Sequence, residues 1–310
     1  MAQKSAIRYL SAAIGAAFIW GFLTIPLKHL HTLNYAPEQI LYYRVLMSFI
    51  ALWIYVLLFR RKPLIHDVSV LRQMPARERR KSIWIILLTG IFITTNWFTY
   101  IYVVNNIGVK VAGFGYLICP LLTAGGGFLL LKEKLSRLKV AGISLAVISI
   151  IILSTGSVSE TLWSIVVAIS YAVYLLLQRL IPQFDKINTL AIQLLISIII
   201  LGPFYIHQFN GLPEQSAFWT DIIVTAVLFT IIPLLLSLYA LSGLPSSTIG
   251  ITIYINPVIT FLVAYFYFHE SFAAWQLMGY SILLASVIIF NWEMIGGALK
   301  NKEQTAAQAT

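Results

Sequence analysis

The sequence predicts an all-α polytopic membrane protein, with ten transmembrane helices arranged as two inverted five-helix repeats. Three observations lead to this fold class: the apolar composition, the length and number of the apolar segments, and the similarity between the two halves of the chain. The 310 residues are 59% hydrophobic and 10% charged, and the mean hydropathy is +0.87. A soluble protein of this length has no interior large enough for that much apolar surface, so most of it must face lipid.

Apolar segments long enough to cross a bilayer follow one another along nearly the whole chain. Each has about 20 residues, which is the length that a helix needs to cross a hydrocarbon core of ~30 Å. Polar linkers rich in Gly, Asn, Ser or Pro separate several of these segments. The predicted spans are residues 9–27, 39–59, 83–104, 111–131, 138–155, 162–180, 189–207, 219–240, 248–268 and 274–292.

The two halves of the chain resemble each other in one gapless register. Residues 102–152 align with residues 239–289 at a constant offset of 137 positions. Matches of Leu, Ile or Val carry little information between apolar helices, whereas matches of Gly, Pro, Thr, Ser and Glu do. The informative pairs are Gly113/Gly250, Pro120/Pro257, Thr123/Thr260, Glu133/Glu270, Gly142/Gly279, Ser144/Ser281 and Ser149/Ser286.

An odd number of helices in each repeat places the second copy upside down in the membrane relative to the first. Inverted repeats of this kind are typical of secondary transporters, which hold their substrate at the repeat interface near the membrane centre. The sequence therefore predicts a first five-helix repeat over residues 1–155 and a second, inverted repeat over residues 156–299. A polar cytoplasmic tail is predicted over residues 300–310.

The basic surplus of the chain, a formal net charge of +10, has an explanation in membrane topology. If the N-terminus is cytoplasmic, 18 of the 21 Lys and Arg residues fall on the cytoplasmic side. This bias predicts that both termini are cytoplasmic, and it makes a nucleic-acid partner unnecessary. The basic cluster over residues 60–81 has two interpretations: a specific anionic-lipid site, or the ordinary topology signal.

Residue types that form metal sites or enzyme active sites are few and scattered. Cys119 is the single cysteine, which excludes an intrachain disulfide and a cysteine-based metal cluster. The five histidines lie near span ends without metal-ligand spacing, and no HExxH, GxSxG or P-loop motif is present. The sequence predicts no metal, no cofactor and no enzymatic activity.

Arg44 is the most informative single side chain. It lies six residues beyond Glu38, roughly 9 Å into the second predicted span at the rise of a helix. A charge at membrane depth costs ~2.5–3.5 kcal/mol on insertion scales, so Arg44 should face the interior of the bundle. Two roles are open: hydrogen bonding to helix carbonyls, or binding an anionic group of a substrate, such as a carboxylate.

Pro120 and Pro257 occupy equivalent positions in the two repeats. A proline removes one helical hydrogen bond and leaves a carbonyl without its donor. Two interrupted helices in matching positions indicate a substrate site. We therefore expect helix breaks at these two prolines, with the neighbouring side chains Tyr116, Tyr254 and Asn256 in a cavity.

Asn96 and Trp97 add a donor–acceptor pair and an aromatic wall in the third span, as a site for a small amphipathic ligand requires. An interhelical hydrogen bond, worth ~0.6 kcal/mol on average, is the alternative for Asn96. Trp20 in the first span is either a cavity wall or part of the core. The predicted substrate-binding residues are Trp20, Arg44, Asn96, Trp97, Tyr116, Tyr254 and Asn256.

Short motifs at the centres and ends of the spans complete the pattern. They are Phe18-Ile19-Trp20-Gly21, Asn96-Trp97, Gly115-Tyr116-Leu117-Ile118-Cys119-Pro120, Tyr254-Ile255-Asn256-Pro257, and the acidic residues Glu133 and Glu270. In these motifs the chain resembles the EamA family of the drug/metabolite transporter superfamily, and within it the RarD-like (chloramphenicol-sensitive protein) permeases. The resemblance implies two inverted five-helix repeats, a central cavity, and transport across the bacterial inner (plasma) membrane.

The sequence thus predicts a permease that moves a small amphipathic organic solute, such as an amino acid, a related metabolite or a drug, by alternating access. The predicted spans hold no carboxylate at their centres, which favours facilitated diffusion or exchange over proton coupling. The predicted partners are the lipid bilayer and the solute, and a homodimer is left open. A non-transporting membrane scaffold or accessory subunit, and an intramembrane enzyme, are the alternatives.

Overall fold

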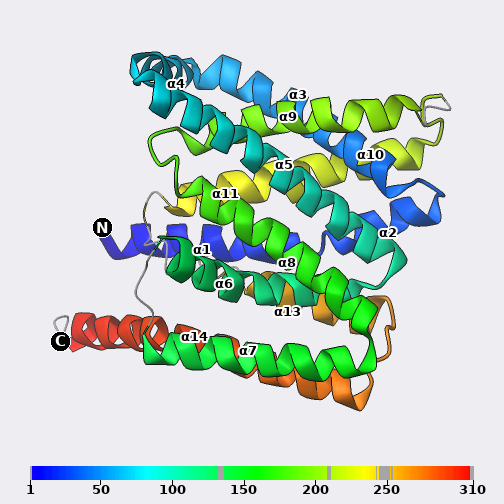
Figure 1. Cartoon of the computed structure of the whole chain (residues 1–310), viewed down its shortest axis with the longest axis vertical. Helices are drawn as coiled ribbons and strands as arrows, with labels where there is room; N and C mark the ends of the chain where they lie inside the picture. Colours follow the sequence, from blue (N-terminus) through cyan, green and yellow to red (C-terminus); the bar gives the residue numbers. More distant parts are fainter. Residues whose placement is uncertain are drawn as a thin grey trace.

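The computed structural model describes residues 2–131, 136–207, 211–241, 243, 252 and 254–307, and these residues form helices joined by short turns. Figure 1 shows the long helices lying side by side along one common direction. In chain order the elements are α1 (Ala2–Gly21), α2 (Thr24–Thr32), α3 (Pro37–Phe59), α4 (Arg61–Gln73), α5 (Ala76–Asn106), α6 (Val109–Leu131), α7 (Arg137–Gly156), α8 (Val158–Gln178), α9 (Lys186–His207), α10 (Ser216–Ala226), the π-helix η1 (Val227–Ile231), α11 (Ile232–Leu241), α13 (Ile255–Leu262), the π-helix η2 (Val263–Tyr267) and α14 (Ala274–Ala307).

Within this described part of the chain, nine helical segments are long and apolar enough to cross a membrane. They coincide with nine of the ten predicted spans and confirm the all-α membrane class. The remaining predicted span, residues 248–268, contains the shorter apolar helix Ile255–Tyr267, while residues 248–251 and 253 lie outside the described residues. A tenth crossing therefore stays a prediction.

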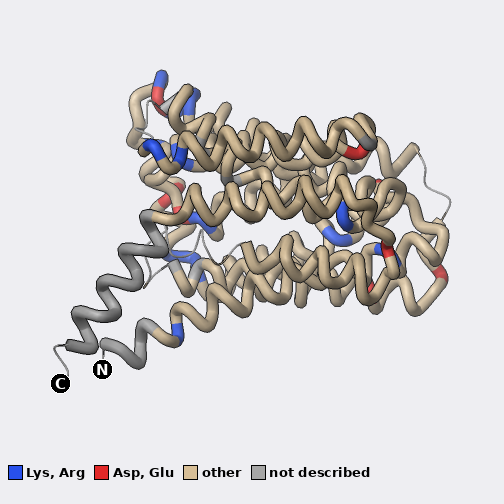
Figure 2. Tube along the Cα trace, turned by 90° about the horizontal axis from the view of Figure 1, so that it is seen from below, with Lys and Arg blue, Asp and Glu red and all other residues tan. Residues whose placement is uncertain are grey.

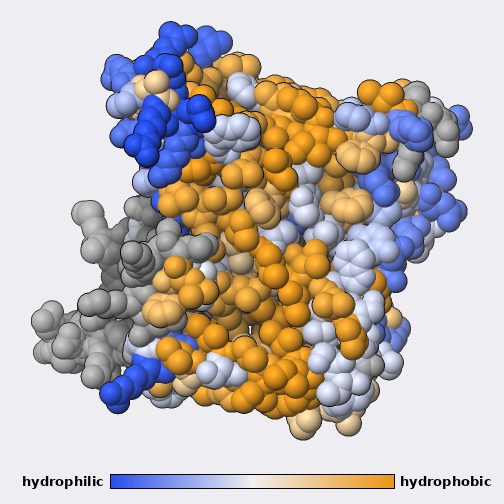
Figure 3. All heavy atoms as spheres, in the orientation of Figure 1, coloured by the Kyte–Doolittle hydropathy of each residue, from blue (hydrophilic) through white to orange (hydrophobic). Residues whose placement is uncertain are grey.

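On the face seen in Figure 3, a broad apolar band lies between more hydrophilic ends. Large apolar side chains on the spans are well exposed, among them Ile151 at 58%, Ile199 at 65% and Phe204 at 62%. Contiguous apolar surface of this extent is unfavourable in water but suits contact with lipid chains. The band thus marks the part of the surface that faces the bilayer.

Most of the basic residues lie toward one end of the molecule (Figure 2). The sequence predicts only a charge cluster over residues 60–81, whereas the structure forms the helix α4 there and begins α5 at Ala76. In Figures 1 and 2, α4 runs across the direction of the long helices. The Asp67 carboxylate fixes α4 to the start of α9, because it accepts a 2.6 Å hydrogen bond from Asn188 Nδ2.

The two halves of the chain meet in reciprocal contacts between α7 and α14, which lie side by side in Figure 1. A Cβ atom on Gly142 would lie 2.8 Å from Phe290 Cβ, and one on Gly279 would lie 2.5 Å from Leu153 Cγ. Gly142 and Gly279 are 137 positions apart, and so are Leu153 and Phe290. The offset found in the sequence therefore also relates the packing of the two halves in space.

Other helix contacts follow the same exchange of halves. The helices α6 and α13 pack against each other, as do α3 and α9. The contact between α1 and α11 corresponds to the contact between α8 and α5. In the same way, the contact between α1 and α13 corresponds to the contact between α8 and α6. Each half thus packs against the other through equivalent helices, and helices of both halves border the space between them.

Candidate functional site

A cavity of about 140 Å³ lies between the two halves of the bundle. An engineered apolar cavity of roughly 150 Å³ binds benzene, so this one has room for a solute the size of a single aromatic ring. Among the described residues, each half contributes seven side chains to the wall. They are Trp20, Leu23, Arg44, Ile93, Trp97, Tyr100 and Tyr116, and Tyr171, Tyr174, Leu190, Phe229, Thr230, Leu234 and Asn256.

Arg44 supplies the charged group of the cavity wall. Its side chain comes from α3 and is buried, with 4% of the residue exposed. The Nε atom donates a 3.1 Å hydrogen bond to Thr230 Oγ1, and the guanidinium carbon lies 5.7 Å from the centre of the Trp97 ring. Nη1 is buried and has no hydrogen-bond partner in the described part of the protein. Arg44, which lines the cavity, therefore retains a donor that no described residue uses.

The acceptor of this arginine, Thr230, lies in the π-helix η1, and π-helical turns inside α-helices are frequent at functional sites. Position 233 of an α-helix would donate to the carbonyl of residue 229, but Pro233 has no N–H. Trp20 Nε1 donates to the Phe229 carbonyl instead, at 3.0 Å. Thr230 Oγ1 in turn donates to the Thr225 carbonyl at 2.9 Å. The irregular turn is thus stabilised by side chains, as irregular backbone at membrane depth requires.

Aromatic rings form a continuous wall from α5 through α6 to α8. The Tyr100 and Tyr116 ring centres are 5.1 Å apart, those of Tyr116 and Tyr171 5.5 Å, and those of Tyr171 and Tyr174 5.7 Å. Ring pairs at these separations stabilise one another beyond simple area burial. The wall is therefore apolar and stiff, with hydroxyl groups as its polar atoms.

Asn96 lies behind this wall and does not line the cavity. It is fully buried, and Nδ2 donates to the Val167 carbonyl at 3.0 Å and to Ser170 Oγ at 3.3 Å. Its Oδ1 accepts a 2.9 Å hydrogen bond from the Tyr116 hydroxyl. Asn96 thus connects α5 to α8 and orients Tyr116, in line with the interhelical alternative for this residue.

The structure brings Trp20, Arg44, Trp97, Tyr116 and Asn256 together around one cavity. These are five of the seven residues that the sequence predicts as substrate-binding; their contact with a solute stays a proposal. Tyr254 does not line the cavity, because its ring packs against the apolar cluster that contains Leu117, Leu283 and Val287.

The predicted helix breaks have different outcomes at the two prolines. The break expected at Pro120 is not found, since α6 continues through this residue. A helix accommodates a proline when the carbonyl one turn earlier, here that of Tyr116, can do without its helical donor. Pro257 lies in the first turn of α13, directly after the turn at Tyr254. Amide groups of a first turn have no helical partners, so proline is tolerated there.

An interruption that is not among the predicted helix breaks lies in the first span, and Pro26 stands in the first turn of the helix that follows it. The helix α1 ends at Gly21, and α2 begins only at Thr24. The Gly21 carbonyl accepts a 3.4 Å hydrogen bond from Thr260 Oγ1, and a Cβ on Gly21 would lie 2.5 Å from Ile259 Cβ. This close approach places Trp20 beside the cavity.

Nine of the fourteen described wall residues are not among the predicted substrate-binding residues: Leu23, Ile93, Tyr100, Tyr171, Tyr174, Leu190, Leu234, Phe229 and Thr230. Pro233 is the one sequence signal for the last two, because a proline inside a span leaves the carbonyl four residues earlier without a donor. Tyr174 and Leu190 carry no such signal. Aromatic and aliphatic residues are common on every face of a membrane helix.

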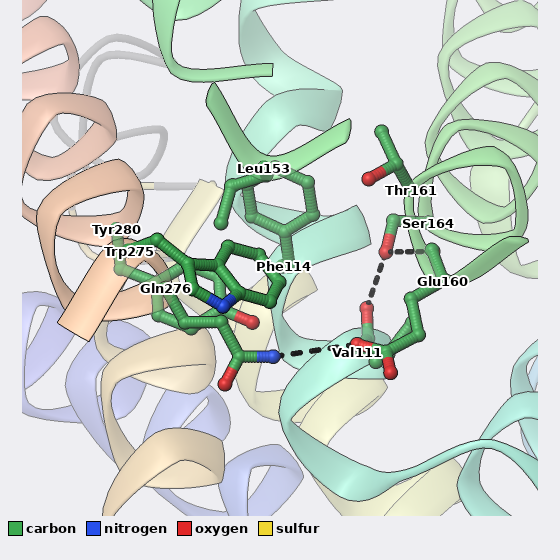
Figure 4. A pocket seen from close by; sticks show the side chains of 9 residues that line it. All are labelled: Val111, Phe114, Leu153, Glu160, Thr161, Ser164, Trp275, Gln276 and Tyr280. Carbon is green, nitrogen blue, oxygen red and sulfur yellow. Dashed lines mark hydrogen bonds between the residues drawn. The ribbon is translucent and has the colours of Figure 1, made fainter. Parts of the chain in front are cut away.

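A second, much smaller hollow lies between α8 and α14 (Figure 4). Its volume is about 10 Å³, which is the size of a single water molecule. Gln276 crosses it and donates to Glu160 Oε2 at 3.4 Å, while its own Oε1 accepts from Lys110 Nζ at 3.2 Å. The polar groups here satisfy each other, so this hollow connects helices and is no solute site.

Comparisons with known proteins agree with this architecture. A model of the EamA-like transporter family matches residues 7–155 and 158–292. The chain is 30% identical to YojE of Bacillus subtilis (strain 168), an uncharacterized transporter, over 89% of this chain and 91% of that protein. It is 27% identical to Protein RarD of Streptomyces exfoliatus over 99% of this chain and 94% of that one.

Protein RarD of Escherichia coli (strain K12) is 25% identical, over 91% of this chain and 93% of that one. A solved crystal structure with 16% identity superposes with a TM-score of 0.59 over 91% of this chain and 96% of the other. This likeness concerns the fold alone. The two family matches together cover nearly all of the spans, one in each half, and show a duplicated, multi-pass membrane protein. The chain therefore belongs to the EamA-like transporter family.

Proposed function

We propose that this protein is a permease of the bacterial inner membrane that moves a small amphipathic organic solute by alternating access. The cavity of about 140 Å³ between the two halves carries this proposal. Transporters built from inverted repeats hold their substrate at such an interface, near the middle of the membrane.

Alternating access requires two units that can rock against each other around a fixed site. The proposed units are a first repeat over residues 1–155 and an inverted second repeat over residues 156–299, ten crossings in total, followed by the tail over residues 300–310. The reciprocal contacts of Gly142 with Phe290 and of Gly279 with Leu153 support this pairing, because they exchange when the halves are exchanged.

The proposed orientation places both termini in the cytoplasm. In Figure 1, α1 begins and α14 ends at the same end of the molecule as α4. This end also carries the basic residues of α4 and of the first turns of α5 (Figure 2). An excess of Lys and Arg marks the cytoplasmic side of inner-membrane proteins, which supports this assignment.

The cavity also separates the proposal from the main alternative, a non-transporting scaffold. A scaffold needs only a well-packed interior, and most of this bundle is packed in that way. An unfilled space lined by polar groups and by a charge is unfavourable for a scaffold, because a buried charge without a partner destabilises the fold. A permease has a use for this space.

Solute flux into sealed vesicles tests the proposal. The purified protein is reconstituted into liposomes, and the uptake of a panel of labelled amino acids, organic acids and amphipathic drugs is compared with uptake into empty liposomes. We expect at least one class to enter faster with the protein, and Leu234→Trp, which fills the cavity, to abolish that uptake. The matched control is Leu195→Trp, whose position is 38% exposed on the outer surface. Equal uptake with Leu234→Trp and with wild type would contradict the proposal.

A further inference from the structure

We propose that the transported solute carries a carboxylate, which binds Arg44, on a body that contains one uncharged ring. This inference rests on the proposed permease function and specifies the solute class of the same cavity. Three features of the cavity, as the described residues form it, lead to this inference: an arginine without a counter-ion, an unused hydrogen-bond donor on that arginine, and walls that lack acidic groups.

The positive charge of Arg44 has no acidic partner in the described part of the protein. The ion pairs found there join His29 with Asp221, Arg60 with Asp185, and His66 with Asp67. Removing a charge from water is compensated only by an opposite charge and by hydrogen bonds at close range. Among the described residues, Arg44 finds one hydroxyl oxygen that accepts a hydrogen bond from Nε, and one aromatic face. An anion that enters the cavity would complete this compensation.

The hydrogen bonds of Arg44 show where the anion binds. A guanidinium group has five N–H donors in a fixed, planar arrangement. The Nε–H group donates its hydrogen bond to Thr230, while Nη1 is buried and has no partner among the described residues. A carboxylate matches the spacing of guanidinium donors and binds more strongly than a neutral acceptor. Thr230 therefore holds the group in place through one edge and leaves another donor for the solute.

The remaining wall defines the body of the solute. Seven aromatic side chains line the cavity: Trp20, Trp97, Tyr100, Tyr116, Tyr171, Tyr174 and Phe229. None of the lining residues in the described chain is acidic, so an ammonium group would find no carboxylate there. The volume of about 140 Å³ admits one ring and little more. A ring with a carboxylate therefore fits this cavity better than an amine or a zwitterion.

Three probes of equal shape test the inference: 3-phenylpropionate, its neutral amide 3-phenylpropanamide, and the zwitterion L-phenylalanine. Binding to the purified protein is measured by calorimetry, and uptake by reconstituted vesicles. In the wild-type protein we expect the carboxylate to bind at least tenfold more tightly than the amide and the zwitterion. This comparison needs no variant, so it stands even where a substituted protein fails to fold.

Variants then assign the preference to one side chain. Arg44→Gln should remove the difference between carboxylate and amide, and Arg44→Lys should keep part of it, because the charge remains. Arg72→Gln is the control, since it makes the same change at an exposed arginine of α4. Equal binding of carboxylate and amide by the wild type would overturn the inference. Binding of none of the three probes, or an unchanged preference in Arg44→Gln, would do so as well.

The outcomes also separate this inference from the permease function. Uptake of the amide or of the zwitterion in preference to the carboxylate would leave the permease standing and refute the anionic solute. Failure of the reconstituted protein to move any solute of the wider panel, whatever its charge, would refute the permease itself.

Discussion

Trp20 Nε1 donates a 3.0 Å hydrogen bond to the main-chain carbonyl oxygen of Phe229. The two residues lie in different halves of the chain, and both line the central cavity. Pro233 cannot provide the helical N–H that would otherwise serve this carbonyl. The bond thus stabilises the π-helical turn that presents Thr230 to Arg44, and it joins the interruption after α1 to the opposite wall.

A double-mutant cycle tests this relationship. Trp20→Phe keeps an aromatic wall but leaves the Phe229 carbonyl without a donor, which should lower the free energy of unfolding by about 1–3 kcal/mol. In a Pro233→Ala background the restored N–H of residue 233 can donate to the Phe229 carbonyl. Trp20→Phe should then lower the free energy of unfolding by clearly less than it does in the wild type. Thermal unfolding of the four proteins in detergent measures the coupling. Strictly additive losses would show that Trp20 and Pro233 act independently.

Thr230→Val tests whether the threonine hydroxyl positions Arg44. The substitution keeps the shape of the side chain and removes the acceptor for Nε, so the guanidinium group should be less well oriented. Losing one hydrogen bond of about 1 kcal/mol corresponds to roughly a fivefold higher KM for a carboxylate solute, with little change in maximal rate. Thr220→Val, at an exposed threonine that bonds only within its own helix, is the control. A KM equal to that of the wild type would exclude a positioning role for Thr230.

Asn96 variants distinguish a helix connector from a ligand. Asn96→Ala removes three hydrogen bonds that join α5, α8 and Tyr116, and at ~0.6 kcal/mol each this should destabilise the protein by about 2 kcal/mol. Tyr116→Phe removes one of the three and should cost about a third as much. Melting temperatures and KM values are measured together. A raised KM with unchanged melting temperature in Asn96→Ala would mean that Asn96 contacts the solute directly.

The glycines of α7 and α14 test the packing between the halves. Gly142→Ala would place a methyl group 2.9 Å from the Ser286 carbonyl oxygen and 2.8 Å from Phe290 Cβ, neither of which can move easily. Gly279→Ala would meet the flexible end of Leu153. Overpacking costs typically 1–3 kcal/mol, so both variants should be less stable than the wild type, and Gly142→Ala more so.

Gly125 of α6 provides the control for these two variants. Apart from its chain neighbours and its own helix backbone, no atom of the described residues would lie within 4 Å of a Cβ at this position. Gly125→Ala should therefore leave the stability unchanged or raise it slightly, because Ala favours the helix over Gly. Unfolding in detergent ranks the three proteins, and a Gly142→Ala protein as stable as Gly125→Ala would contradict the described packing.

Much of the fold follows from patterns that the sequence displays directly. Span positions depend on hydropathy over about 20 residues, and lipid leaves a segment of that length few structures other than a helix. Arg44 could be assigned to the interior for the same reason, since a charge at that depth avoids lipid. The offset of 137 positions relates Gly142 to Gly279 in the sequence, and in the structure these two glycines make equivalent contacts with Phe290 and Leu153.

The details that the sequence leaves open depend on the rotation of helices and on hydrogen bonding, which hydropathy does not report. Asn96 and Trp97 are neighbours in sequence, yet on a helix they point in different directions, and only Trp97 reaches the cavity. The helix α6 is continuous through Pro120, whereas the first span is interrupted after Gly21, just ahead of Pro26 in the first turn of α2. The helix α4 is not predicted from hydropathy, because its many charged residues leave only a short apolar side, and only part of that side is buried.

Cysteine chemistry at Leu234 tests the central claim, that the cavity between the halves is the path of the solute. Cys119 is only 2% exposed and belongs to the core, so a Cys119→Ser background should retain uptake and provide a silent reference. In that background Leu234→Cys is treated with a small, negatively charged methanethiosulfonate reagent. We expect complete modification to abolish uptake and a transported solute to slow the modification. Full uptake by a protein whose Leu234→Cys thiol is shown by mass spectrometry to be fully modified would contradict the claim.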